Sequence, residues 1–189
     1  MKARKKFQGQ VILVRGIPGS GKSHYAEELQ EKFKTKGISG IHYVYCSADQ
    51  FFMVRSQRPV VEGKRYPSLE YQYDPTKLGQ AHAQCQRRFI DALHTDAAVI
   101  IVDNTFIRLW ELENYIRLAR DAGYEVTIFE MQVETIKELK ACVARNVHKV
   151  PAEVIARMAM DFEPYINEGK DGLVRVGKIV PYPGPGSVM

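Results

Sequence analysis

Residues 16–23 read Gly-Ile-Pro-Gly-Ser-Gly-Lys-Ser, and this motif constrains the fold of the chain more than any other feature of the sequence. It matches the pattern GxxxxGK[ST] in full, and it lies between an apolar run at 10–15 and a segment at 20–36 with helical spacing. Such a glycine-rich turn aims successive backbone N–H groups and a helix N-terminus at negative charge. The motif therefore predicts a phosphate-binding loop rather than an ordinary strand-to-helix turn.

The residue types within the motif indicate a nucleoside triphosphate and its metal. The lysine of such a loop bridges the β- and γ-phosphates, and the Ser/Thr hydroxyl binds Mg²⁺. We therefore expect ATP and Mg²⁺ as ligands, Lys22 as a catalytic residue and Ser23 as a metal ligand. The residues expected to bind the nucleotide are Gly16, Gly19, Ser20, Gly21, Lys22 and Ser23.

Strand and helix patterns alternate along the rest of the chain. This alternation predicts the three-layer α/β fold of P-loop NTPases, with a mostly parallel central sheet flanked by helices. Ligands of such a sheet bind at the carboxyl ends of its strands. No regular element is expected at 51–74 or after 167. Strands are predicted at 10–15, 42–46, 97–102 and 124–131, and helices at 20–36, 76–93, 112–122, 135–147 and 152–165.

Composition narrows the class of protein. The 189 residues suit one domain, and 45% hydrophobic with 26% charged residues predict a folded core. No apolar run approaches the roughly 18–20 residues that a membrane helix needs, so we expect a cytoplasmic protein. The net charge of +5 fits a polyanionic partner such as ATP or nucleic acid. Cys46, Cys85 and Cys142 are too far apart in the sequence to indicate a disulfide framework or a zinc site.

Two aspartates follow predicted strands and therefore belong at the same edge of the sheet as the phosphate-binding loop. Asp103 ends the run VIIVD, where an acid orders Mg²⁺ or its waters, and the alternative is a turn residue that opens Asp-Asn-Thr. Asp49 follows the second strand. It either caps a helix or receives the hydroxyl group of a phosphate acceptor.

The acceptor role of Asp49 has a thermodynamic limit. A carboxylate with a pKa near 4 lies roughly 12 units below a hydroxyl resembling water, so full deprotonation in the ground state would cost roughly 16 kcal/mol. A loose phosphoryl-transfer transition state avoids this cost because the proton leaves late. We therefore expect Asp49 to act as a catalytic residue that orients the nucleophile first and takes its proton late.

Residues 145–151, RNVHKVP, separate the last two predicted helices, where a mobile helical lid could close over the phosphates. An arginine delivered in this way accelerates phosphoryl transfer by about 10³–10⁵. Arg145 is therefore a candidate catalytic and nucleotide-binding residue, and a solvated helix end is the alternative. His148 and Lys149 are candidate acceptor contacts. His82, on the predicted apolar face of its helix, is either a core histidine or a further acceptor contact.

These segments, in this order, resemble the polynucleotide-kinase-like branch of the P-loop kinases. The resemblance rests on GIPGSGKS, SADQFF, LGQAHAQCQRR, VDNT with Trp110-Glu111 shortly after it, and ARNVHKVPAEVIARM. It implies the use of ATP and Mg²⁺ and an acceptor hydroxyl on nucleic acid. In this family an aspartate like Asp49 activates the hydroxyl, an acid like Asp103 lies in the site, and a lid arginine like Arg145 contacts phosphate.

The chain departs from the polynucleotide kinases proper at Phe52, where they carry an arginine. The resemblance therefore implies one of two acceptors. The first is the 5′-OH of a polynucleotide. The second is the hydroxymethyl group of a modified pyrimidine in DNA, as in related viral kinases, in which case the protein would act in the host cytoplasm.

The segment at 51–74 is the best candidate for contacts with such an acceptor because it mixes basic and aromatic residues. Bases stack on aromatic faces while cations follow the backbone of a single strand. The alternative is a surface loop whose aromatic rings fold under it. We assign Phe52, Arg55 and Arg58 to the acceptor site. The full set is Phe51, Phe52, Arg55, Arg58, Lys64, Arg65, Tyr66, Tyr71 and Tyr73.

Together these observations predict an ATP-dependent kinase that transfers the γ-phosphate to a hydroxyl group on nucleic acid. We expect a basic extension at 1–9, a P-loop kinase domain at 10–166 and a Gly/Pro-rich tail at 167–189. A kinase of a small molecule, a nucleotide or a sugar nucleotide is the alternative on the same fold. A further alternative is an ATP-binding switch or interaction module, which needs no acceptor carboxylate such as Asp49.

Overall fold

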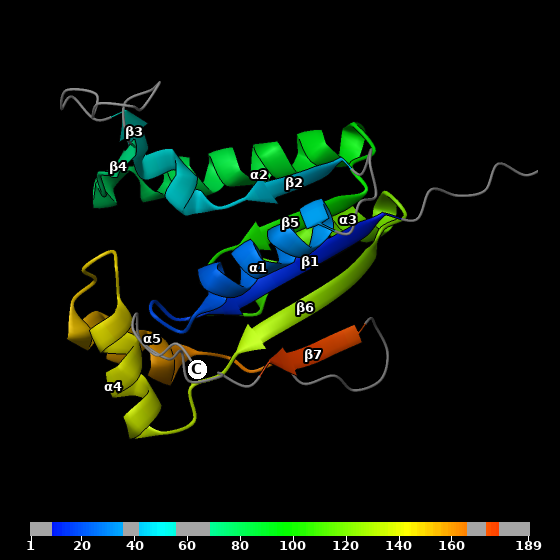
Figure 1. Ribbon diagram of the computed structural model, residues 1–189. Coiled ribbons are helices and arrows are strands. Elements are labelled where there is room, and N and C mark those ends of the chain that lie inside the picture. Colours follow the sequence, from blue (N-terminus) through cyan, green and yellow to red (C-terminus); the bar gives the residue numbers. More distant parts are fainter. Residues whose placement is uncertain (1–8, 36–41, 56–68, 166–172, 178–189) are drawn as a thin grey trace, which may run out of the picture.

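The computed structural model describes residues 9–35, 42–55, 69–165 and 173–177 (Figure 1). At its centre lies a sheet of five strands in the order β2-β5-β1-β6-β7, in which all neighbouring strands are parallel. The predicted α/β fold with a mostly parallel sheet is therefore confirmed. The strands are β1 (Gln10–Gly16), β2 (Tyr43–Cys46), β5 (Val99–Asp103), β6 (Glu125–Met131) and β7 (Leu173–Gly177).

Helices cover both faces of this sheet (Figure 1). Successive residues of β1 point to opposite faces, so Val11 and Leu13 pack with α2 and α3 whereas Ile12 and Val14 pack with α1. None of the described helices is long and apolar enough to cross a membrane. The helices are α1 (Lys22–Thr35), α2 (Leu78–His94), α3 (Trp110–Asp121), α4 (Ile136–Arg145) and α5 (Ala152–Asp161), with the 3₁₀-helices η1 (Ala48–Phe52) and η2 (Pro75–Lys77).

A smaller apolar cluster joins α4 and α5, the two lid helices, to the phosphate-binding loop. Ile17 of the loop, Cys142 of α4 and Ile155 of α5 are each at most 2% exposed and pack in this cluster. A full capping box starts α4, because the Thr135 side chain accepts from Glu138 N while the Glu138 carboxylate accepts from Thr135 N. Figure 1 shows both lid helices at the end of the sheet where β1 enters the loop.

Two regions depart from the sequence prediction. Within 51–74, expected to be irregular, β3 (Met53–Arg55) pairs antiparallel with β4 (Leu69–Tyr71). Each strand has three residues, too few to give a periodic pattern. The strand β7 lies in the segment expected to be a tail without regular structure, and it pairs with β6 at the edge of the sheet.

A buried ion pair holds the residue that directly precedes the phosphate-binding loop. Arg15 is fully buried, and its Nη1 lies 2.9 Å from Oε2 of Glu130 on the neighbouring strand β6. Its Nε donates to the Phe106 carbonyl at 2.9 Å, and its guanidinium lies 4.2 Å from the centroid of the Phe162 ring. The same Glu130 oxygen accepts from Tyr165 N at 2.9 Å. Arg15 and Glu130 thus tie the central strands to the loop after β5 and to the segment after α5.

Glu130→Leu should lower the free energy of unfolding by roughly 3–5 kcal/mol, because it leaves the Arg15 charge buried without its partner. Urea unfolding followed by circular dichroism measures this change. Glu125→Gln, at the exposed start of the same strand, should change it by less than about 0.5 kcal/mol. Adding Arg15→Met to Glu130→Leu should restore part of the loss, and a double variant less stable than the single one would contradict this account of the pair.

Candidate functional site

The phosphate-binding loop between β1 and α1 packs against the lid helix α4 through its main chain. Gly19 has φ +76°, and a Cβ atom added to it would overlap the carbonyl oxygen of Cys142. Gly21 has φ +96°, but a Cβ atom there would meet nothing within 4 Å. Glycine is therefore required at 19 by both conformation and space, while the loop at Gly21 borders open space.

Two buried side-chain oxygens at this edge of the sheet have no hydrogen-bond partner among the residues that the structure describes. They are Ser20 Oγ in the loop and Asp103 Oδ1 at the end of β5. The other Asp103 oxygen, Oδ2, accepts from the Tyr45 hydroxyl at 2.9 Å. Burial raises the pKa of Tyr45 and the Asp103 carboxylate raises it further, so the phenol keeps its proton and remains a donor.

This arrangement suits Mg²⁺ and a phosphate group. Asp103 lies opposite Val14 in the β1–β5 pairing, two residues before the first glycine of the motif. Lys22 and Ser23 begin α1, and Lys22 is only 7% exposed. Magnesium prefers oxygen ligands and is bound through one or two carboxylates together with phosphate oxygens. The free Asp103 oxygen and the Ser23 hydroxyl are the side-chain groups that fit such an ion.

Asn104, which sequence reasoning treated only as part of a turn, connects the ends of β5 and β2. Its Oδ1 accepts from Ala48 N at 2.9 Å, and its Nδ2 donates to Cys85 Sγ at 3.4 Å. Ala48 directly precedes Asp49 in η1. This buried amide therefore fixes the start of η1 against β5 and α2, and the polar residue after Asp103 was the sequence signal that could have identified it.

Asp49 lies in η1 with a side chain that is 41% exposed. The cap of η1 is Ser47, whose Oγ accepts from Asp49 N at 3.3 Å, so Asp49 is not an N-cap. Its Oδ1 accepts from the Tyr71 hydroxyl at 3.0 Å, and its Oδ2 lies 3.6 Å from Nε2 of His148. The carboxylate thus faces the β3–β4 hairpin on one side and the lid on the other.

The side chain of Arg145 lies along its own lid helix, α4. Nε of Arg145, the last residue of α4, donates to the Ala141 carbonyl in its own helix at 3.2 Å. Burial raises the pKa of Cys142, and the positive charges of Arg145 and Lys22 both oppose this rise. Cys142 is fully buried, and its main-chain carbonyl group faces Gly19 of the loop.

Two lid residues predicted to contact the acceptor lie in different surroundings. His148 reaches Asp49, and its ring packs on the Tyr71 ring with the centroids 4.0 Å apart. Lys149 is exposed and has φ +55°. The sequence pattern does not distinguish Tyr71 from the other aromatic residues of its segment. Only the structure shows that Tyr71 contacts Asp49.

None of the other acceptor candidates that the structure describes forms a side-chain hydrogen bond or ion pair with Asp49. Phe52 is 3% exposed and packs edge-on against Tyr71 and Tyr73, so its ring supports the hairpin instead of offering a face to a base. Arg55 is exposed on β3. Arg58, Lys64, Arg65 and Tyr66 lie outside the described residues.

His82 is exposed on α2, so the interpretation as a core histidine is wrong. The buried stripe of the helix passes one position earlier, and one position is a rotation of about 100° around a helix axis. Its buried residues are Ala81, Cys85, Phe89, Ala92 and Leu93.

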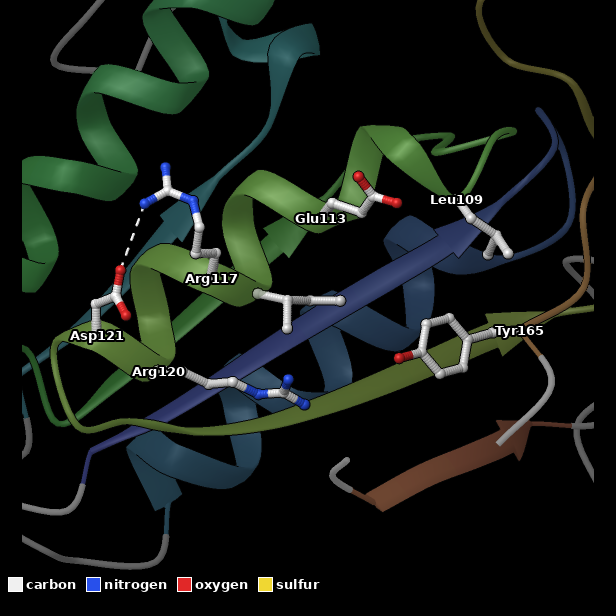
Figure 2. A pocket seen from close by; sticks show the side chains of 7 residues that line it. Leu109, Glu113, Arg117, Arg120, Asp121 and Tyr165 are labelled. Carbon is white, nitrogen blue, oxygen red and sulfur yellow. Dashed lines mark hydrogen bonds and ion pairs between the residues drawn. The ribbon is translucent and has the colours of Figure 1, made fainter. Parts of the chain in front are cut away.

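Two cavities lie outside the Asp49 and Asp103 clusters. One, of about 500 Å³, runs along α3, and Figure 2 shows that Arg117 and Asp121 pair at its rim, 3.4 Å apart and both mostly exposed. The other, of about 200 Å³, touches the phosphate-binding loop at Ile17 and lies between the end of β6 and α5. The first is lined by Leu109, Glu113, Ile116, Arg117, Arg120, Asp121 and Tyr165.

Gly19→Ala should lower the free energy of unfolding by roughly 1–3 kcal/mol or more, because the new methyl group meets the Cys142 carbonyl and the backbone keeps a positive φ. Thermal or urea unfolding measures the change. Gly79→Ala, on α2, is the matched control, since its Cβ atom would meet nothing within 4 Å. That change should be neutral or stabilise the helix by up to about 1 kcal/mol, and equal losses in both variants would contradict the contact.

Comparison with known proteins identifies the family to which the chain belongs. The model described as AAA domain matches residues 11–165. NEDD4-binding protein 2 from Homo sapiens is 32% identical over 157 residues, which cover 83% of this chain and 8% of that protein. YLP motif-containing protein 1 from Rattus norvegicus is 26% identical over 159 residues, which cover 81% of this chain and 11% of that protein. The chain thus spans only a small part of the length of these curated relatives.

Solved structures show the same fold at low sequence identity. A gluconokinase from Sinorhizobium meliloti has a TM-score of 0.54 at 15% identity, covering 93% of this chain and 85% of that chain. Kti12 from Chaetomium thermophilum, in complex with ADP-AlF3, has a TM-score of 0.59 at 14% identity, covering 89% and 88%. The APS kinase CysC from Mycobacterium tuberculosis, in complex with AMPPNP and APS, has a TM-score of 0.53 at 16% identity, covering 89% and 88%.

The family match runs from the first residues of β1 to the segment after α5. The phosphate-binding loop, the four strands β2, β5, β1 and β6 of the sheet and the two lid helices fall inside it, whereas β7 lies beyond its end. The chain therefore belongs to the AAA domain family (AAA_33) and is a kinase-like P-loop domain.

Proposed function

We propose that this chain is an ATP-dependent phosphotransferase that transfers the γ-phosphate to a hydroxyl group on nucleic acid. The observation that carries the proposal is the Asp49 carboxylate, which is half-exposed and held beside the lid at the same edge of the sheet as the phosphate-binding loop. A nucleotide switch needs no carboxylate at this place, whereas a kinase needs one to orient its acceptor. Kti12 in complex with ADP-AlF3 and the APS kinase in complex with AMPPNP support a nucleotide on this fold.

The transfer step follows from the residues in place. The loop N–H groups and Lys22 bind the β- and γ-phosphates, and Arg145 at the end of α4 is the cation that closure of the lid would add. The acceptor oxygen forms a bond to the γ-phosphorus while the bond from this phosphorus to the β–γ bridging oxygen breaks, and ADP leaves. The acceptor proton passes late to Asp49. Ser23 and Asp103 would hold Mg²⁺, which would supply charge neutralisation on the phosphate oxygens.

The hairpin beside Asp49 favours a nucleic-acid acceptor. Tyr73 is 52% exposed and Arg55 is exposed on β3, so this hairpin region offers both an accessible aromatic ring and an accessible cation. Rings that stack on bases and cations that follow the phosphate backbone are the usual contacts for a single strand. The net charge of +5 is consistent with such a polyanion.

Labelled ATP offered with a panel of acceptors tests this function. The panel contains a single-stranded oligonucleotide with a 5′-OH, DNA with hydroxymethylated pyrimidines, nucleosides and sugars. Label is expected on one of the two nucleic-acid acceptors. Transfer to a sugar or nucleoside alone would show that the acceptor class is wrong, and ATP binding without transfer to any acceptor would overturn the kinase assignment.

Asp49→Asn should reduce kcat by about 10²–10⁴, because it removes the group that receives the acceptor proton. The Kd for ATP should stay within about 2-fold of its original value, since Asp49 lies on the acceptor side of the site. Steady-state transfer and equilibrium ATP binding give the two values. Asp91→Asn, on the exposed face of α2, is the control and should change neither.

Asp103→Asn should raise the Mg²⁺ concentration needed for half-maximal transfer by about 10-fold or more, because a neutral amide replaces the buried carboxylate oxygen. A magnesium titration of the transfer rate measures this shift. The variant keeps an oxygen that can accept from Tyr45, so its unfolding midpoint checks that the fold is retained. An unchanged magnesium requirement would remove Asp103 from the metal site.

A further inference from the structure

The two oxygens of the Asp49 carboxylate are in contact with different elements of the fold. Tyr71 on β4 donates its hydroxyl to Oδ1 at 3.0 Å, whereas His148 in the lid places Nε2 3.6 Å from Oδ2. The Tyr71 and His148 rings also pack on each other, with centroids 4.0 Å apart and planes inclined by 39°. Three segments far apart in the sequence therefore meet at one carboxylate.

The Tyr71 contact belongs to the same local unit as Asp49. Asp49 lies in η1, which leads directly into β3, and Tyr71 pairs with Met53 at the start of β3. The adjacent Gln72 donates its N–H to the Phe52 carbonyl at 2.8 Å. The carboxylate and its phenol donor are thus held in register by main-chain hydrogen bonds.

The His148 contact is weaker and comes from outside this unit. A donor–acceptor distance of 3.6 Å is beyond that of a hydrogen bond. His148 lies in the connection between α4 and α5, and its side chain is 30% exposed. An incoming hydroxyl group can therefore take its place at Oδ2 without breaking a hydrogen bond.

The Tyr71 hydroxyl is a donor and not an acid at neutral pH. Burial raises its pKa, and the charge of Asp49 raises it further. The phenol therefore does not exchange protons with the reacting groups. Its effect on the reaction is through the orientation of Asp49, because terminal carboxylate torsions are otherwise broad and two-fold.

We propose that Tyr71 is a positioning residue that fixes Oδ1 of Asp49 and thereby aims Oδ2 at the acceptor hydroxyl, which binds in the place that His148 takes beside it. This inference rests on the proposed kinase function and adds a specific residue to it. A misplacement of about 1 Å in a reacting group costs about 10²-fold in rate. The Tyr71 hydrogen bond is therefore expected to contribute to kcat and not to ATP affinity.

Tyr71→Phe is the test, because it removes the hydroxyl and keeps the ring that packs on His148. The expected result is a kcat lower by about 10- to 100-fold with the KM for ATP unchanged. Tyr43→Phe, the same substitution on β2, should leave kcat and both KM values unchanged. In the Asp49→Asn protein, Tyr71→Phe should change the residual rate by less than about 2-fold, because the two residues act through one interaction.

A second measurement separates this inference from the proposed function. Thermal unfolding midpoints of Tyr71→Phe, Asp49→Ala and the double variant form a cycle that needs no acceptor. The effect of Tyr71→Phe should differ between the Asp49 and Asp49→Ala backgrounds, and equal effects would overturn the contact itself. Wild-type transfer with a Tyr71→Phe kcat equal to that of the wild type would overturn the positioning role and leave the kinase function standing. Absence of transfer by the wild type would overturn both.

Discussion

The site depends on the parallel pairing of β1 with β5 on one side and with β6 on the other. Parallel strands end at one edge of the sheet, so the loop after β1 and the acids after β5 and β2 meet there without long connections. The same pairing places Glu130 of β6 beside Arg15, and this buried pair neutralises a charge next to the loop. Because Glu130 neutralises Arg15, the positive charge beside the phosphate-binding loop comes from other residues, such as Lys22.

Two aspartates at this edge have the same chemical group and different surroundings. Asp103 is 2% exposed, and one of its oxygens accepts a hydrogen bond from Tyr45. The other oxygen is buried and suited to a cation. Asp49 is half-exposed, and one of its oxygens accepts a hydrogen bond from Tyr71. The other oxygen faces the lid. Burial and the carboxylate charge raise the pKa of both tyrosines, so each remains a hydrogen-bond donor. In the proposed function, depth below the surface thus distinguishes the proposed metal ligand Asp103 from the proposed acceptor carboxylate Asp49.

The sequence predicted the parts of this site that are contiguous in the chain. The phosphate-binding loop and the strand ends follow from local patterns, because a strand, a glycine-rich turn and a helix are all encoded within a few residues. Tyr71, Asn104 and the Arg15–Glu130 pair did not follow, because their partners are chosen by tertiary packing. The helical pattern predicted His82 on the apolar face of α2. The buried face passes through Ala81, one position earlier, and His82 is exposed.

Cys142 meets Gly19 of the phosphate-binding loop through its main-chain carbonyl group. A substitution at 142 that fits the same buried volume leaves that contact intact, whereas no side chain can be added at Gly19. Tolerance to substitution is therefore unequal across one interface. The interface restricts the helix side only by the buried volume at Cys142, and the loop side to glycine.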